Sequence, residues 1–175
     1  MEYRPELTAI VRKEITRPLR IALEHGLIKK TDRVLDYGSG KSMDCAYLDK
    51  NGITCIRYDR YYQPERPVGM FDVIMCTYVL NVVPPQEQEA IVTDMMSLLK
   101  PFGRIVIAVR TPSEILREAT EHHWECQPSG YITSRGTYQI GIDENDLIRL
   151  LVRNYPGGIL QIDANVYVYE DRDWK

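Results

Sequence analysis

The stretch Val34–Ser42, which reads VLDYGSGKS, brings an acid, two glycines, a lysine and a serine into one short segment. Its last three residues match the end of a Walker A phosphate-binding loop, Gly-x-x-x-x-Gly-Lys-Ser/Thr. The first glycine of that loop would fall at Leu35, inside an apolar run, and the third glycine of a dinucleotide fingerprint would fall at Met43. Both phosphate-binding motifs are incomplete, so phosphate binding through Lys41 remains only an alternative.

Asp36 is the discriminating residue of this segment, because it stands two positions before the first glycine, Gly38. A carboxylate at that position would repel a pyrophosphate, but it suits a ligand that carries a cationic ammonium group. S-adenosylmethionine is such a ligand.

The elements that must position this loop alternate along the chain. Strand-like apolar runs are separated by helical segments, a pattern typical of a parallel sheet with right-handed crossovers. The expected strands are RVLDY (33–37), ITCIRYD (53–59), FDVIMC (71–76) and GRIVIAVR (103–110), and the expected helices between them are 43–52 and 85–100. A capping box, TPSE, opens a helix at Thr111 that we expect to run to about Glu125.

The two ends of the chain complete this outline. Apolar residues in 7–15 and 19–23 predict two short helices separated near Pro18, the second capped by Thr16 and stopped by Gly26. After an irregular extended segment at 130–141, a second helix is expected from Asp143 to residue 152, followed by a closing hairpin in 159–171. We therefore predict one α/β domain: a helical brace (1–30), a cofactor-binding half (31–110), and a substrate-side half with the hairpin (111–175).

Four motifs in order resemble the class I S-adenosylmethionine-dependent methyltransferases. The first is the VLDYGSG segment, the second is the acidic residue that ends IRYD, the third is FDVIMCTYVLNVV, and the fourth is KPFGRIVIAV. The resemblance covers residues 31–110 in order and, more weakly, the closing hairpin. It implies a Rossmann-like sheet that is mostly parallel and ends in an antiparallel hairpin.

The resemblance also implies the cofactor contacts. The glycines let the backbone approach the methionine portion of S-adenosylmethionine, Asp36 orients that portion directly or through water, and Asp59 accepts both ribose hydroxyls. The implied cofactor-binding residues are Asp36, Tyr37, Gly38, Ser39, Gly40, Asp59, Arg60, Tyr61, Cys76 and Thr77.

One departure from the family concerns the third strand. Only 71 − 59 − 1 = 11 residues separate Asp59 from Phe71, too few for the helix, strand and helix that usually lie there. We expect the third strand to be missing, together with the loop that usually covers the adenine. Tyr61 or Tyr62 then stacks on the base or, as the alternative, covers the exposed edge of the sheet.

The methyl acceptor should lie after the fourth family strand, where the chain reads Cys76-Thr77-Tyr78-Val79. The segment lacks the Asn/Asp-Pro-Pro-Tyr/Phe motif of amino-group DNA methyltransferases and the Pro-Cys nucleophile of cytosine C5 enzymes. Tyr78 and Asn81 are our candidates for orienting the acceptor; alternatively, Tyr78 packs under the cofactor and Asn81 caps a helix. The segment SRGTYQ adds candidate substrate-binding residues, with an ordinary surface loop as the alternative: Arg135, Tyr138 and Gln139.

Composition and charge give no support for nucleic acid, a membrane or a metal ion as a partner. The chain has 175 residues, a net charge of −3 and scattered basic residues, so nothing favours nucleic acid. The charged N-terminus lacks the apolar run of a signal peptide or membrane span, so we expect a cytoplasmic protein with reduced cysteines. The segment HHWEC (122–126) lacks a second ligand pair, so we expect no metal site.

The sequence thus predicts an S-adenosylmethionine-dependent methyltransferase that acts on an oxygen or nitrogen of a small molecule. The segments YVLNVVP and RGTYQIG are also similar to those of methyltransferases linked to DNA phosphorothioation. Two alternatives stay open: a catalytically inactive cofactor-binding partner subunit, and a methyltransferase associated with nucleic-acid modification. The sequence does not identify the oligomeric state.

Overall fold

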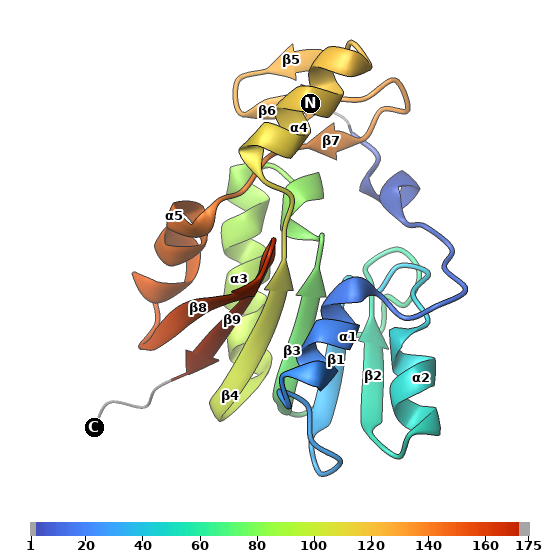
Figure 1. Ribbon diagram of the computed structural model, residues 1–175, viewed down its shortest axis with the longest axis vertical. Helices are drawn as coiled ribbons and strands as arrows, with labels where there is room; N and C mark the ends of the chain where they lie inside the picture. The colour runs from blue at the N-terminus through green and yellow to red at the C-terminus, as the bar shows by residue number, and fades with distance from the viewer. Residues whose placement is uncertain (1–2, 172–175) are drawn as a thin grey trace.

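A six-stranded sheet forms the centre of the computed structural model, which describes residues 3–171 (Figure 1). The strand order is β2-β1-β3-β4-β9-β8; the first four strands are parallel, and the last two form an antiparallel hairpin. The bounds are β1 Arg33–Tyr37, β2 Thr54–Tyr58, β3 Phe71–Thr77, β4 Leu99–Ala108, β8 Gly157–Asp163 and β9 Val166–Asp171. The predicted Rossmann-like sheet with its closing hairpin is confirmed.

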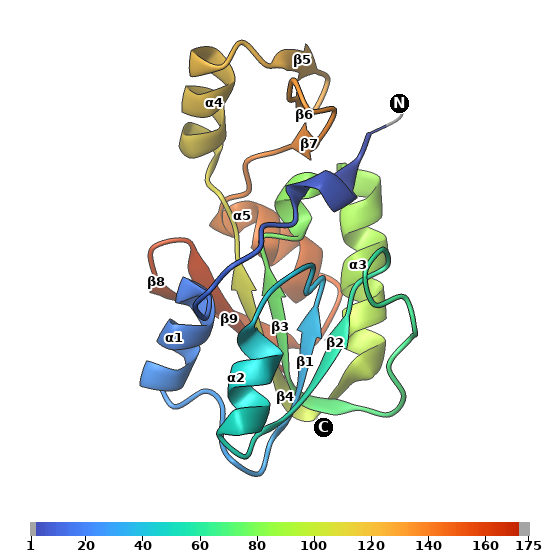
Figure 2. The same ribbon diagram turned by 90° about the vertical axis from the view of Figure 1, so that its right-hand side faces the viewer.

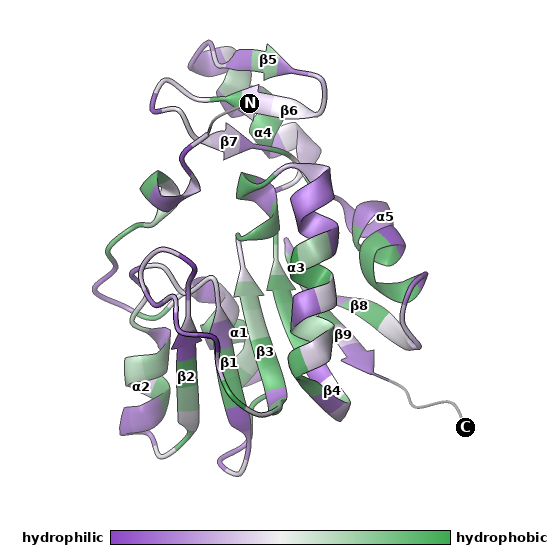
Figure 3. Cartoon of the chain, turned by 180° about the vertical axis from the view of Figure 1, so that it is seen from behind, coloured by the Kyte–Doolittle hydropathy of each residue, from purple (hydrophilic) through white to green (hydrophobic). Residues whose placement is uncertain are grey.

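Helices cover both faces of this sheet (Figure 2). The helices α1 Arg17–Glu24 and α2 Asp44–Lys50 pack on one face, and α3 Pro85–Leu98 and α5 Glu144–Leu147, continued by a π-helical turn at Ile148–Val152, pack on the other. Alternate residues of each strand therefore enter opposite cores: Leu35 packs with the α3 side and Val34 with the α1 side. Hydrophobic residues accordingly concentrate along the central strands, with hydrophilic residues on the outer parts of α3 (Figure 3).

The third family strand is absent, as predicted, because residues 59–70 lead from β2 to β3 without forming a strand. This leaves β2 at the edge of the described sheet. Two contacts shield that edge: the Cys55 N–H donates to Asp49 Oδ1 at 3.0 Å, and Asp59 and Gln63 exchange backbone hydrogen bonds of 3.1 and 2.8 Å. Both contacts satisfy backbone groups that an exposed edge would otherwise offer to another chain.

The N-terminal region differs from the expected helix pair. Thr16 caps α1 as predicted, since its side chain accepts the Leu19 N–H at 3.3 Å. The expected helix over 7–15 is wrong: the chain makes one 3-10 turn, η1 Pro5–Thr8, and then crosses the molecule without regular structure. Ile10 and Val11 are 62% and 73% exposed, so the middle of the apolar stripe has no surface to pack against, and a helix that short needs one. We call residues 3–16 the strap.

A segment between β4 and α5, residues 110–142, projects beyond the carboxyl ends of β3 and β4 (Figure 1). We call it the insert. Its helix, α4 Pro112–Glu121, begins with the predicted capping box of Thr111 and Glu114 but ends before residue 125. The expected irregular segment instead contributes to a three-stranded antiparallel sheet, whose strands are β5 Glu125–Gln127, β6 Gly130–Ile132 and β7 Tyr138–Gln139.

Two of the cysteines correct the expectation of free thiols. Cys45 on α2 and Cys55 on β2 form a disulfide, with their Cα atoms 5.0 Å apart. Their spacing in the sequence matches no redox or metal motif, and only the packing of α2 against β2 brings them together. Cys76 and Cys126 remain thiols.

Candidate functional site

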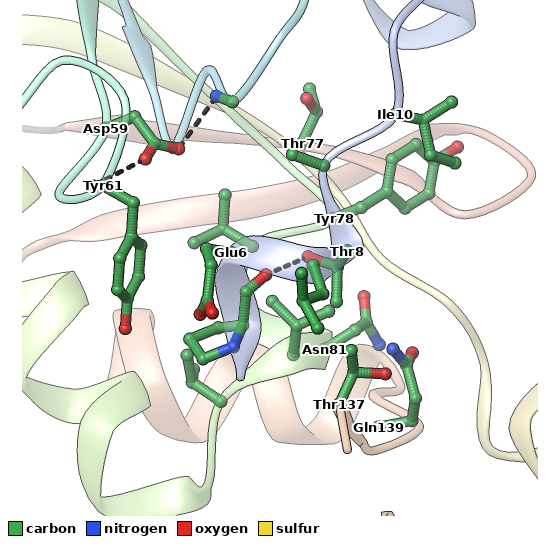
Figure 4. Close-up of a pocket in the computed structure, with 18 of the residues that line it drawn as sticks. Glu6, Thr8, Ile10, Asp59, Tyr61, Thr77, Tyr78, Asn81, Thr137 and Gln139 are labelled. Carbon is green, nitrogen blue, oxygen red and sulfur yellow. Dashed lines mark hydrogen bonds between the residues drawn. The ribbon is translucent and has the colours of Figure 1, made fainter. Parts of the chain in front are cut away.

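A cavity of about 1220 Å³ opens at the carboxyl ends of the parallel strands (Figure 4). Open α/β sheets bind ligands at this position. Seven segments form its walls: the end of β1 and its loop (37–42), the end of β2 and its loop (58–62), the end of β3 and its turn (77–83), the N-terminal part of α3 (87–91), the turn between β8 and β9 at Asn165, the strap and the insert. The cavity therefore joins the predicted cofactor region to the predicted acceptor region.

The loop after β1 depends on its glycines for close approach between chain segments. Gly38 and Gly40 have φ angles of +72° and +50°, in the region that favours glycine. A Cβ on Gly38 would lie 2.3 Å from a methyl of Val79, and one on Gly40 would lie 3.1 Å from the Cβ of Ala9 on the strap. Ser39 Oγ is buried without a hydrogen-bond partner among the described residues. An unused hydroxyl in a glycine cradle fits a polar ligand.

Asp36 lies beneath this loop and is 2% exposed. Burial raises its pKa to about 7, although the hydrogen bond from Ser42 Oγ, at 2.7 Å, opposes the shift. The residue is not part of the cavity wall. Its position suits an indirect electrostatic contribution to cation binding.

Asp59 holds the loops after β1 and β2 together. Its Oδ2 accepts the Gly40 N–H at 2.9 Å, and its Oδ1 accepts the N–H groups of Tyr61 and Tyr62 at 2.9 and 3.0 Å. A carboxylate offers about four acceptor sites, so about one remains for a ligand. The geometry thus favours one ribose hydroxyl on Asp59, where the sequence suggested two.

The tyrosines after β2 face different environments. Tyr61 is 45% exposed and points into the cavity, with the Arg60 guanidinium 5.3 Å from its ring centre (Figure 4). Tyr62 has Lys41 at 5.0 Å from its ring centre and donates its hydroxyl hydrogen to the Glu6 carbonyl at 2.8 Å. Tyr61 is therefore the better stacking surface, and Tyr62 connects to the strap.

Two predicted cofactor residues direct their side chains into the core. Cys76 is fully buried, does not line the cavity, and has a pKa raised to about 12 by burial. Strand alternation turns its side chain toward α3, so the structure does not bring it to the site. Tyr37 contributes to the cavity wall, but its hydroxyl donates to Asp94 on α3 at 2.8 Å.

Thr77 is the last residue of β3, Tyr78 follows it, and both line the cavity. Tyr78 has a φ of +60°, which is costly for an aromatic residue, and its N–H donates to the Ala108 carbonyl at 2.8 Å. Ile10 of the strap lines the same cavity (Figure 4). The strained turn therefore presents an aromatic side chain to the acceptor region.

Asn81 is fully buried although it borders the cavity. Its Nδ2 donates to the carbonyls of Arg110 and Ile140 at 3.0 and 2.7 Å, and its Oδ1 accepts the Arg110 N–H at 2.8 Å. These bonds join the turn after β3 to both ends of the insert. The geometry assigns Asn81 a positioning role and leaves little hydrogen-bonding capacity for an acceptor.

The three predicted substrate residues have different surroundings. Gln139 lines the cavity and is 9% exposed, and its side-chain amide has no hydrogen-bond partner in the described part of the chain. Arg135 also lines the cavity, but it donates to the Leu7 carbonyl of the strap at 2.9 Å. Tyr138 is buried away from the cavity and donates to the Ser129 carbonyl at 2.7 Å. Gln139 is thus the residue best placed to meet a ligand.

Sequence reasoning missed several cavity residues of the insert. Arg110 lies two residues beyond the end of β4 and forms an ion pair with Glu118 on α4. Although burial raises the pKa of Glu114, hydrogen bonds from Thr111 and Asn165 hold it below its usual value. Because Arg110 follows a parallel strand, its position in the sequence could have predicted that it lines the ligand site. The strap residues carried no comparable signal, since they belong to no motif.

Described residues show neither a metal-binding group nor a membrane-spanning helix. No cluster of three or more His, Cys, Asp or Glu side chains in 3–171 is arranged to hold a metal ion. Over the same range, no helix has both the length and the apolar character needed to cross a bilayer.

Solved structures similar to this chain include several methyltransferases. The chain is 18% identical to the 1,6-didemethyltoxoflavin-N1-methyltransferase of Burkholderia thailandensis, with a TM-score of 0.61, covering 89% of this chain and 77% of that one. For an S-adenosylmethionine-dependent methyltransferase of Bacteroides fragilis, the identity is 15%, the TM-score 0.57 and the coverage 91% and 78%. For the N-methyltransferase NodS of Bradyrhizobium japonicum, these values are 12%, 0.54, 90% and 85%.

Sequence comparison agrees with the fold. A search of curated proteins found no match. The sequence model of a family described as the methyltransferase domain matches residues 7–138, which include the strap from Leu7 onward, the glycine loop, both acidic residues and most of the insert. The chain therefore belongs to the methyltransferase domain family, on the Rossmann-like fold of S-adenosylmethionine-dependent methyltransferases.

Proposed function

We propose that this methyltransferase transfers a methyl group from S-adenosylmethionine to a nitrogen or oxygen atom of a small molecule. The observation that carries the proposal is the size and continuity of the cavity. Pockets for one drug-sized ligand measure about 300–1,000 Å³. A cavity of about 1220 Å³ that reaches from Asp59 to Gln139 offers room for a cofactor and a small acceptor together.

The residues of the cofactor side fit S-adenosylmethionine. The glycine cradle with the unpaired Ser39 hydroxyl suits the polar methionine portion, Asp36 favours its ammonium group, and Asp59 retains about one acceptor for the ribose. The three structural neighbours described above were each solved with bound S-adenosylhomocysteine, the demethylated cofactor. When bound, the cofactor supplies an electrophilic methyl group on a sulfonium.

The closure of the cavity supports a small acceptor over a macromolecule. The strap joins the insert through the Arg4 N–H, which donates to the Gly136 carbonyl at 2.9 Å, and through Arg135, which donates to the Leu7 carbonyl. A bridge over the cavity favours a small molecule over a folded nucleic acid or protein surface as the acceptor. Two structural neighbours are named as N-methyltransferases, one of them with bound 1,6-didemethyltoxoflavin.

Within this proposal, the residues of the acceptor side act by positioning. Tyr78 provides an aromatic wall, and the Gln139 amide provides one donor group and one acceptor group. Tyr78 lies on the turn after β3 and Gln139 lies on the insert. The hydrogen bonds of Asn81 hold this turn and the insert together. Holding a nucleophile in line with the methyl group can supply much of the rate acceleration in such a displacement.

A methyl-transfer screen tests the proposal. Purified protein and methyl-labelled S-adenosylmethionine are incubated with separate pools of small amines, phenols and heterocycles, and with RNA, DNA and protein. We expect label in a small-molecule pool, and we expect Gln139→Ala to reduce transfer while leaving S-adenosylhomocysteine affinity within about threefold.

Two outcomes would replace the proposal. Label found only in nucleic acid would favour a methyltransferase of nucleic-acid modification. Tight cofactor binding without transfer to any pool would favour a catalytically inactive partner subunit.

A further inference from the structure

The strap lies where the missing third strand leaves the cofactor site uncovered. Beyond Asp59, the cavity is bordered by Pro5 and Glu6 of the strap, by Tyr61, and by the first turn of α3 at Glu87. Residues 59–70 contribute no strand to this side. The N-terminal 3-10 turn therefore supplies a wall at the place where the family fold usually has a later segment.

The carboxylates of this region differ in how much hydrogen-bonding capacity they keep. Asp59 already accepts three backbone N–H groups. Glu87 uses both oxygens, one for the Tyr3 hydroxyl and the other for Arg60 at 3.3 Å. Glu6 uses only Oε1, which accepts from Arg4 Nε at 3.1 Å, and no partner for its Oε2 exists among the described residues.

The position of Glu6 is held from its backbone. Its carbonyl accepts the Tyr62 hydroxyl at 2.8 Å, and the next carbonyl in the chain, that of Leu7, accepts Arg135. Its side chain is 26% exposed and points into the same part of the cavity as Tyr61 (Figure 4). A carboxylate oxygen and an aromatic face are thus presented together.

We propose that the strap is the adenine-recognition element of this enzyme: Glu6 accepts a hydrogen bond from the 6-amino group, and Tyr61 stacks on the base. An exocyclic amino group donates hydrogen bonds, and an ionised carboxylate can only accept them. A 6-oxo base would instead turn an acceptor toward the carboxylate. The inference rests on the cofactor of the proposed function and is independent of the acceptor.

The test compares S-adenosylhomocysteine with S-inosylhomocysteine, which differs in carrying a 6-oxo group. Calorimetric titration of the full chain should show inosyl binding about 10- to 100-fold weaker, the range expected for losing a charge-assisted hydrogen bond. Glu6→Ala should weaken adenosyl binding and abolish the discrimination. Glu6→Gln should bring the two affinities within about threefold, because an amide can accept from the amino group or donate to the oxo group.

Two further variants separate recognition of the 6-amino group from general effects on ligand affinity. Glu65→Ala removes an exposed carboxylate of the neighbouring loop that does not line the cavity, so it should leave both affinities unchanged. Tyr61→Ala should weaken both ligands equally, since stacking does not distinguish them.

Each contrary result has a distinct meaning. Equal affinities in the unsubstituted protein, or discrimination that survives in Glu6→Ala, would overturn the role of Glu6. Absence of any S-adenosylhomocysteine binding would instead overturn the proposed function.

Discussion

Asp36 is a buried carboxylate that makes stability depend on pH. Its pKa is raised from 3.8 to about 7 by burial, so the folded state disfavours its ionised form. Its contribution to stability is complete below the unfolded pKa and is lost as pH rises toward 7. Relative to Asp36→Asn, the cofactor-free protein should lose on the order of 2 kcal/mol of unfolding free energy between pH 5.5 and 8. Urea unfolding at both pH values measures this; parallel behaviour of the two proteins would contradict it.

The same residue should make cofactor affinity depend on pH. A ligand ammonium favours the ionised carboxylate, so S-adenosylhomocysteine should bind the unsubstituted protein up to about tenfold more tightly at pH 8 than at pH 6. Asp36→Asn should lack this increase, and it serves as the control for protons lost by the ligand itself. Calorimetry should also detect proton uptake from buffer when the ligand dissociates near pH 7. An identical pH profile in the variant would exclude Asp36 from ligand binding.

Asp59 should matter for the cofactor in two ways. Asp59→Ala removes the remaining acceptor for the ribose and also releases the Gly40 N–H and the turn at Tyr61. We expect cofactor binding to weaken by about 1–3 kcal/mol. Titration with S-adenosylhomocysteine measures the loss. Unchanged affinity would place the ribose elsewhere.

At the scale of elements, the glycine loop is built for close contact with its neighbours. Gly38→Ala should destabilise the protein by about 2–4 kcal/mol, because a left-handed residue gains a Cβ that would meet Val79 at 2.3 Å. Gly52→Ala is the matched control: its φ is +79°, but nothing lies within 4 Å of the added Cβ. It should cost only about 1 kcal/mol of backbone strain. Denaturant unfolding compares the two, and equal losses would show that Val79 moves aside easily.

Sequence patterns predicted the elements that have local causes. The parallel strands, the capping box at Thr111, the helix start at Asp143, and the hairpin all follow from residue types a few positions apart. The absence of the third strand was predicted from the short spacing between Asp59 and Phe71 alone. The prediction of a helix over 7–15 was wrong because a short helix needs a surface on which its apolar residues can pack. Whether such a surface exists depends on the tertiary structure.

At the scale of the whole molecule, Asn81 couples the sheet to the insert. Asn81→Ala leaves the partly buried carbonyls of Arg110 and Ile140 without their side-chain donor, which should cost about 1–3 kcal/mol. Amide exchange over 112–139 should then accelerate at least about tenfold, because the insert is held less firmly.

A second buried amide provides the control for Asn81. Gln88 is 3% exposed and donates to the carbonyls of Leu80 and Val83 at 2.9 and 3.3 Å, away from the insert. Gln88→Ala should destabilise the protein without accelerating exchange in the insert. Equal acceleration in both variants would mean that the insert responds only to global stability.

The sequence by itself determined the sheet, the glycine loop, and the placement of Asp36 and Asp59 at the ends of two neighbouring strands. These features depend on period, spacing and the chemistry of single side chains, which are visible along the chain. Only the tertiary structure decided that the strap walls the cavity, that Asn81 binds both ends of the insert, and that Cys45 meets Cys55. Each of these contacts joins residues whose meeting depends on how distant elements pack, so no local pattern records it.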